Sequence, residues 1–248
     1  AADSASVTPA RTQTERSAAL TETLLQRYGV VTREVASVEG ITGGFSAVYD
    51  VFKALEEGGR IRRGYFVSGV SAMQFALPGV LEQLRSLRRE PDLPEVVHLA
   101  ATDPANPYGA LIKWPEAGAG RSLARAAHAL VILINGALAA YLARGGRTMQ
   151  VFLPEAEPDR THVARALAAR LRLLASTPER GGLAIAEIDG EPAEQHSLGP
   201  QLREAGFLPS KQGFYLPRNA REQVLPLVAA DADLEALTDS EEPEAQDA

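Results

Sequence analysis

The stretch "GGFSAVYDVFKALEEGGRIRRGYFV", residues 43–67, decides how the chain is expected to fold. Its first half has apolar side chains at the three- and four-residue spacing of a helix face: Phe45, Val48, Phe52 and Leu55. A glycine pair at 58–59 ends this helix. From Ile61 to Val67 the pattern then changes to the alternation of a strand, with arginines among its residues. A helix that leads directly into a basic strand indicates the third helix and first wing strand of a winged helix-turn-helix.

The flanking sequence supports this interpretation. Two earlier helices are predicted, one over residues 14–28 that ends at Gly29 and a shorter one over residues 32–40. A second alternating run at 73–77 follows a small-residue loop and predicts the second wing strand. The order of helices and strands is that of a winged helix-turn-helix domain over residues 14–90, preceded by a flexible N-terminal segment over residues 1–13.

The second half, residues 95–217, is predicted to be an antiparallel, barrel-like α+β domain. Its strands are expected in the apolar runs 96–101, 110–114, 128–134, 137–143 and 147–153, and later at 183–188. Asn135-Gly136 and Asp189-Gly190 are strong signals for tight turns. A helix is expected over residues 160–175, a second one ends at Gly206, and a hairpin over 207–217 completes the domain.

Charge is distributed unevenly along the 248 residues, whose formal net charge is −7. Nine of the 32 acidic residues follow Arg221, where Lys and Arg are absent, so the remaining body is slightly basic. We expect residues 222–248 to form a disordered acidic tail, because they lack the apolar side chains that would offset the entropy cost of ordering. The start at Ala1 suggests a piece of a longer polypeptide.

Several protein classes are excluded or disfavoured. The chain has no cysteine, which excludes disulfides and thiolate metal sites. No apolar run approaches the roughly 20 residues of a membrane span, so we expect no membrane partner and a cytoplasmic location. The four histidines are far apart in sequence, and neither a phosphate-binding loop with its lysine nor a G-x-S-x-G motif occurs. We therefore expect no metal or nucleotide cofactor in these residues.

Candidate nucleic-acid contacts lie on the third helix and the strand after it. The helix surface opposite the apolar stripe carries Ser46, Asp50 and Lys53, with Tyr49 at its edge, and the strand carries Arg60, Arg62 and Arg63. Each arginine is able to neutralise a backbone phosphate. Three carboxylates on the same helix, those of Asp50, Glu56 and Glu57, oppose such contact. A purely structural or protein-docking role for this unit remains the alternative.

Two further candidate sites are in the second half. Arg144 and Arg147 flank a glycine pair in a turn where both are able to reach a phosphate, although solvated surface charge explains them equally well. The loop "TDPANPYG", residues 102–109, presents Asp103 and Asn106. Asp103 is a weak candidate for a catalytic carboxylate that positions a water, and the alternative is that it caps a turn.

Three long segments resemble the C-terminal part of the Lhr (large helicase-related) proteins, which are superfamily 2 DNA helicases. They are "RYGVVTREV" (27–35), "EGITGGFSAVYDVFKALEEGGRIRRGYFVSGVSAMQFALPG" (39–79) and "LAATDPANPYGALIKWP" (99–115). The similarity extends from about Tyr28 to Phe214. It implies winged-helix modules followed by a β-barrel-like domain, attached to an upstream motor that uses ATP and Mg.

The resemblance also implies partners and activities. Members of the family act on single-stranded DNA and RNA:DNA hybrids and are linked to DNA repair. The C-terminal portion is similar in architecture to AlkZ-type DNA glycosylases, whose Gln-x-Gln motif is absent here, since "MQF" supplies only Gln74. The leading hypothesis is a nucleic-acid-binding module of such a helicase that contacts backbone phosphates. The alternatives are part of a glycosylase domain and a self-association module that forms a homo-oligomer.

Overall fold

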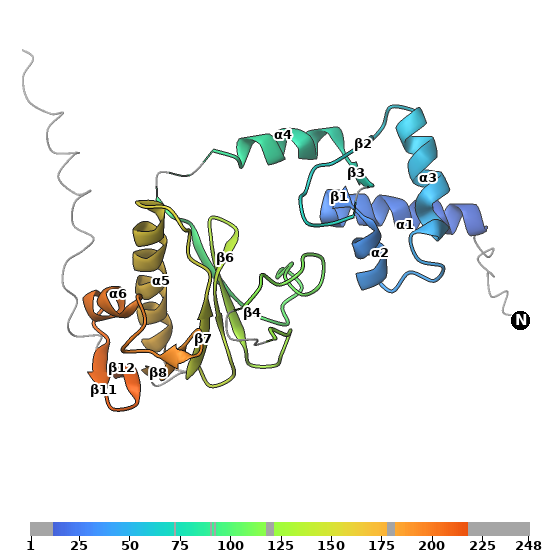
Figure 1. The fold of residues 1–248 in the computed structure, drawn as a ribbon. Coiled ribbons are helices and arrows are strands. Elements are labelled where there is room, and N and C mark those ends of the chain that lie inside the picture. The colour runs from blue at the N-terminus through green and yellow to red at the C-terminus, as the bar shows by residue number, and fades with distance from the viewer. Residues whose placement is uncertain are drawn as a thin grey trace, which may run out of the picture.

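The structure is a computed structural model that describes residues 12–71, 73–89, 91, 93–117, 122–177 and 182–217. Two groups of elements, each with its own buried core, follow one another along the chain (Figure 1). The first comprises three helices and a small sheet, and the helix α4 (Pro78–Ser86) leads from it towards the second. The predicted acidic tail and most of the predicted flexible N-terminal segment lie outside the described residues.

The winged helix-turn-helix predicted from the sequence is confirmed. Its elements are α1 (Gln13–Tyr28), β1 (Val30–Val31), α2 (Arg33–Val38), α3 (Ser46–Glu57), β2 (Arg62–Gly64) and β3 (Gln74–Ala76). Thr12 begins α1 through a capping box with Glu15, which satisfies free backbone N–H groups at the helix start. The two-residue strand β1 was not predicted. It pairs with β3, so that the wing sheet has the order β1-β3-β2.

The core of the winged helix is aromatic. Phe52 of α3 stacks on Phe75 of β3 with ring centroids 4.9 Å apart, and both side chains are fully buried. Phe45 stacks on the same two rings at 5.7 and 6.2 Å. Val48 is also buried, so the apolar stripe of the third helix faces the core as its spacing predicts.

The second group of elements is a sheet packed on a helix. The strands β4 (Val96–Ala100), β5 (Leu130–Ile134), β6 (Ala137–Leu142) and β7 (Thr148–Val151) are antiparallel as predicted, and they form a meander. Asn135 and Gly136 join β5 to β6 with φ values of 50° and 80°, the left-handed conformation that such a turn requires. The remaining elements are α5 (Asp159–Ala175), β8 (Gly182–Ile185), β9 (Glu187–Ile188), β10 (Glu191–Pro192), α6 (Gly199–Glu204), β11 (Leu208–Ser210) and β12 (Gly213–Pro217).

The barrel-like closure expected from the sequence is not found among the described strands. One open sheet has the order β10-β9-β7-β6-β5-β4, and β11, β12 and β8 form a separate one. The sheet is also not purely antiparallel, because β9 pairs with β7 in parallel. The chain leaves β7, passes through α5 and β8, and returns as β9 beside β7. A crossover that contains a helix allows two strands to lie side by side in the same direction. α5 thereby covers one face of the sheet (Figure 1). This face is buried by the helix, so the sheet does not have to close into a barrel to bury it.

Residues 110–114, predicted as a strand, are not one. They form turns in which the carbonyl of Pro107 accepts hydrogen bonds from the backbone of Ala110, Leu111 and Ile112. The predicted strand over 183–188 is divided into β8 and β9, which belong to different sheets. None of the described helices is both long and apolar enough to cross a bilayer.

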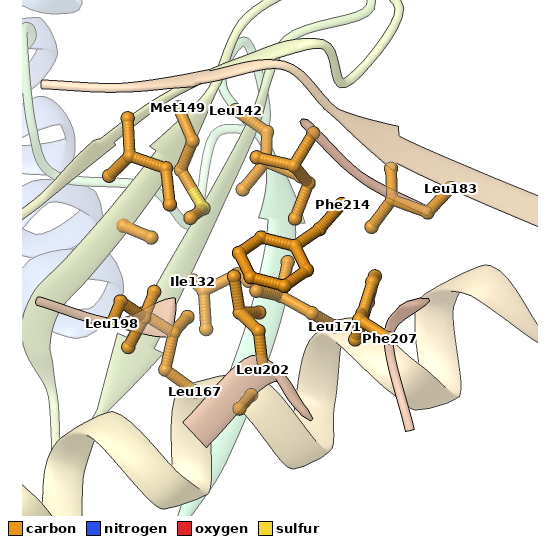
Figure 2. Packing of buried hydrophobic residues seen from close by; sticks show 14 of the residues in the cluster. Ile132, Leu142, Met149, Leu167, Leu171, Leu183, Leu198, Leu202, Phe207 and Phe214 are labelled. Carbon is orange, nitrogen blue, oxygen red and sulfur yellow. The ribbon is translucent and has the colours of Figure 1, made fainter. Parts of the chain in front are cut away.

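The main core of the second group lies between α5 and the sheet. Leu167 and Leu171 of α5 meet Ile132 and Met149 from the sheet and Phe214 from β12 (Figure 2). Leu202 of α6 and Phe207 belong to the same cluster and lie next to the two α5 leucines. The predicted apolar face of this helix is therefore the face that is buried.

Two leucines of α5 provide a matched test of this core. Leu171 is fully buried and Leu173 is 60% exposed. We expect Leu171→Ala to lower the free energy of unfolding by about 2–5 kcal/mol, because it leaves a cavity in a packed core. Leu173→Ala should change it by less than about 0.5 kcal/mol. Urea denaturation measures both, and equal losses would contradict this account of the packing.

Candidate nucleic-acid interface

Arg60, Arg62 and Arg63, here called the basic ribbon, follow the end of α3. β2 holds the last two in register with Ala76 and Phe75 of the buried strand β3. All three side chains are exposed. In the described part of the chain neither Arg60 nor Arg62 forms an ion pair, whereas the Nε of Arg63 lies 3.2 Å from an Oε1 of Glu56. The three arginines are therefore close together in the chain and exposed at the surface.

The outer face of α3 is less suited to a polyanion. Ser46 and Lys53 are exposed there as expected, but Asp50 is exposed beside them, and the Nζ of Lys53 lies 3.8 Å from a carboxylate oxygen of Glu57. Tyr49 is half-buried, with its ring centroid 6.1 Å from that of Phe45 and 6.4 Å from that of Phe75. The helix face thus presents more carboxylates than ammonium groups, and the excess positive charge is on the ribbon.

The loop of the wing is held by a buried glutamine that sequence analysis did not assign to this task. Gln74 has no exposed surface. Its Oε1 accepts hydrogen bonds from the backbone N–H groups of Phe66 and Val67, both at 2.8 Å, and its Nε2 donates to the carbonyls of Val67 and Ser71. The amide satisfies two donors and two acceptors of the loop. A lone glutamine in an otherwise apolar strand was the available signal.

A carboxylate of α2 holds the same loop from the other side. Glu34 accepts hydrogen bonds from the Ser71 backbone N–H at 3.0 Å and from the Ser71 hydroxyl at 2.8 Å. Burial alone would raise the pKa of Glu34, but hydrogen bonds from Thr32, from its own backbone and from Ser71 together lower it below the usual 4.5. The ionised carboxylate is therefore the form that anchors the wing.

Arg144 and Arg147 occupy the turn between β6 and β7, and both are exposed. The Nη2 of Arg147 lies 3.4 Å from Oε1 of Gln212 in the β11–β12 turn. Figure 1 shows that turn at the end of the second group of elements that is distant from α3. These two arginines are close to each other but do not form one continuous patch with the basic ribbon.

Asp103 lies in a tightly hydrogen-bonded loop. Its Oδ1 accepts from the backbone of Ala105 at 2.8 Å, which is the turn-capping role. Asn106 is buried, and its Nδ2 donates to the carbonyl of Ala101 at 2.9 Å. The guanidinium of Arg125 closes the loop by donating to four backbone carbonyls, those of Thr102, Asp103, Asn106 and Tyr108. Arg125 was not singled out in the sequence, because no spacing distinguishes it from the other arginines nearby.

The loop also connects the two groups of elements. The indole of Trp114 stacks near Tyr108, with ring centroids 6.0 Å apart, and packs so closely on Gly109 that a side chain there would overlap it. Leu111 packs against the core of the winged helix. Together with Val80 and Leu84 of α4, it lines an apolar groove of about 500 Å³. The loop is therefore a structural connection between sheet and winged helix.

The described residues contain no group of three or more His, Asp or Glu side chains placed to hold a metal ion. The arrangement offers electrostatic contact and a fixed wing. The fold and the ribbon together define a winged-helix module joined to an α+β sheet unit.

Comparisons with known proteins identify the family. The model of the winged-helix domain of the large helicase-related protein matches residues 10–96. The "Lhr helicase/ probable uracil glycosylase" of Mycolicibacterium smegmatis is 40% identical over 173 residues, which are 68% of this chain and 11% of that protein. The "Lhr helicase/uracil glycosylase" of Escherichia coli K12 is 37% identical over 203 residues, 81% of this chain and 13% of that protein.

The chain belongs to the Lhr family and corresponds to a C-terminal region of it. It spans only 11% and 13% of the lengths of these two relatives. The resemblance found in the sequence is thereby confirmed.

The four hydrogen bonds that Arg125 donates to the 102–109 loop, here called the Arg125 clamp, lead to a prediction about stability. Arg125→Ala removes charge-assisted hydrogen bonds to four carbonyls, and we expect it to lower the free energy of unfolding by about 2–3 kcal/mol. Arg125→Lys should recover only part of this, because an ammonium lacks the planar fork of a guanidinium. Arg165→Ala, which removes an exposed ion pair with Glu204, should change stability by less than about 1 kcal/mol in urea denaturation. A full recovery by lysine would contradict the clamp.

The hydrogen bonds of Glu34 to Ser71 lead to a prediction about how stability depends on pH. Because its folded-state pKa is lowered, Glu34 stabilises the fold above pH 4.5, and this stabilisation is lost as the pH falls through the lower folded-state value. In Glu34→Gln this contribution to acid destabilisation should be absent. Urea midpoints measured from about pH 3 to about pH 7 test this, with Glu82→Gln, an exposed carboxylate of α4, as the control that keeps the wild-type profile.

Proposed function

We propose that this part of the Lhr C-terminal region binds nucleic acid mainly through backbone phosphates. The observation that carries the proposal is the basic ribbon, three exposed arginines presented from a wing whose backbone is held by Gln74 and Glu34. Arginine forks suit phosphate oxygens, and each neutralised phosphate releases counterions. A fixed wing lowers the ordering cost of such contacts.

The charges of α3 support backbone contact rather than sequence readout. Its exposed face carries Asp50 and the Lys53–Glu57 pair, so an approach into the major groove would place carboxylates near phosphates. The ion pairs of Lys53 and Arg63 are partly solvated, and pairs of that kind contribute little to stability. Both cations are therefore able to exchange their carboxylate partners for phosphates at small cost.

The wider role rests on the family. In the proposal, the region supports a helicase of the Lhr type during DNA repair, with single-stranded DNA or an RNA:DNA hybrid as its partner. The upstream helicase domains of the same protein would supply ATP hydrolysis with Mg. Arg144 and Arg147 would form a second, separate phosphate contact on the sheet unit.

A salt titration of affinity tests the proposal. The logarithm of affinity should fall linearly with the logarithm of salt concentration, with a slope of about −0.7 per phosphate contact on single strands and about −0.9 on duplex. Replacing Arg60, Arg62 and Arg63 together with glutamine should reduce the single-strand slope by roughly 2. Fluorescence anisotropy with a labelled oligonucleotide measures both quantities.

The matched control replaces Arg160, Arg165 and Arg203 with glutamine. These arginines lie on α5 and α6, and their replacement changes the net charge by the same amount. An unchanged slope in the ribbon variant, or an equal reduction in the control, would show that the ribbon is not the contact surface.

A second candidate function is base excision, because both relatives carry uracil glycosylase in their names. A flipped base would need a carboxylate that orients water, and Asp103 in its fixed loop is the local candidate. Incubation of the chain with uracil-containing DNA and with the same DNA lacking uracil tests this. Base release that is lost in Asp103→Ala would support it, and no release by the unaltered chain would end it.

A further inference from the structure

The aromatic ring of Tyr65 is the most exposed large hydrophobic side chain among the described residues, at 80%. It directly follows β2 and therefore lies at the start of the wing loop, next to the basic ribbon. A tyrosine of the folded core would bury most of its ring, as Tyr49 and Tyr141 do. The exposure of Tyr65 is therefore a feature of the wing surface.

The backbone on both sides of Tyr65 is held in place. On one side, Gly64 pairs with Gln74, and the ring of Phe66 lies so close that a Cβ at position 64 would be 3.0 Å from it. On the other side, the N–H groups of Phe66 and Val67 donate to the amide oxygen of Gln74. The ring of Tyr65 is thus presented from an ordered backbone, and binding through it costs little further ordering.

The charge around Tyr65 favours one kind of occupant. From residue 59 to residue 71 the sequence contains the three ribbon arginines and no Asp or Glu. In the fold, Glu56 pairs with Arg63 and Glu34 binds Ser71, so these two carboxylates offset part of the charge of the three arginines, and positive charge remains in excess. A polyanion is therefore attracted to the strand that ends at Tyr65. An exposed aromatic ring beside arginines is the combination that binds single strands, in which bases stack on the ring while cations follow the backbone.

We propose that Tyr65 stacks on an unpaired base of a single-stranded nucleic acid whose phosphates lie along the basic ribbon. This inference rests on the proposed function and adds a contact that distinguishes single strands from duplexes. In a duplex the base faces are already stacked on one another, so the ring finds no free face. In a single strand every base offers one, and the contact is independent of sequence.

The test compares two oligonucleotides of equal length and charge. One carries thymines, and the other carries abasic tetrahydrofuran units at all internal positions. Tyr65→Ala in the full 248-residue chain should weaken binding of the thymine strand about tenfold. It should leave binding of the abasic strand unchanged, since the phosphates are the same. Tyr65→Trp should restore affinity for the thymine strand, because an indole also stacks.

The control variant is Tyr215→Ala, which removes a partly exposed tyrosine from β12, on the separate three-stranded sheet. It should bind both strands as the unaltered chain does. Circular dichroism of each variant confirms that the fold is retained. A 2-aminopurine placed in the strand reports stacking directly, through quenching that should disappear in Tyr65→Ala.

The outcomes separate the two proposals. If Tyr65→Ala binds the thymine strand with unaltered affinity, or loses the same affinity for both strands, the proposal that Tyr65 stacks on a base is wrong. The proposal that the ribbon binds phosphates is not affected by either result. If the exposed ring instead serves a protein partner, affinity for both strands is unaltered, which also overturns the inference. If the ribbon variant has an unchanged salt slope, it is the phosphate-binding proposal that fails.

Discussion

The winged helix depends on a strand of three residues, β3, whose side chains are all fully buried. Phe75 stacks on Phe52 and thereby attaches the wing sheet to α3, while Ala76 lies opposite Arg62 in the ladder with β2. Gln74, at the other end, directs its amide into the wing loop and satisfies four backbone groups there. Buried polar groups are costly unless they are paired, so this glutamine makes one conformation of the loop far more favourable than others. The loop held by Gln74 begins directly after Tyr65, whereas Arg62 and Arg63 are positioned by the pairing of β2 with β3.

A small number of side chains also joins the winged helix to the sheet unit. The guanidinium of Arg125 donates hydrogen bonds to four carbonyls of the 102–109 loop. The segment after the loop places Leu111 against the core of the winged helix. Asp103, the candidate catalytic carboxylate, and Asn106, which the same loop presents, form hydrogen bonds to the backbone of Ala105 and Ala101. This hydrogen-bonded loop and the segment after it keep the two groups of elements in contact.

Much of the winged helix could be predicted from sequence because its signals are local. The stripe through Val48 and Phe52 determines which side of α3 is buried, and the alternation after Ile61 predicts the ribbon. The sheet unit was predicted less well. Its tight turns at Asn135-Gly136 and Asp189-Gly190 were correct, since both need left-handed backbone, but residues 110–114 are as apolar as a strand and fold into turns instead. Periodicity over five residues does not distinguish a strand from a partly buried loop.

By itself, the sequence determined the family, the order of helices and strands in the first half apart from β1, and the concentration of arginines after the third helix, because each depends on neighbouring residues. Only the tertiary structure decided which charges remain available. Glu56 and Glu57 pair with Arg63 and Lys53, Gln74 is committed to the loop, and Tyr65 remains exposed. It also decided that β9 runs parallel to β7 and leaves the sheet open. The Lys53–Glu57 pair has the i,i+4 spacing of a helix, but the others join different elements, and the pairing of β9 with β7 joins residues about 40 positions apart, so no local pattern encodes them.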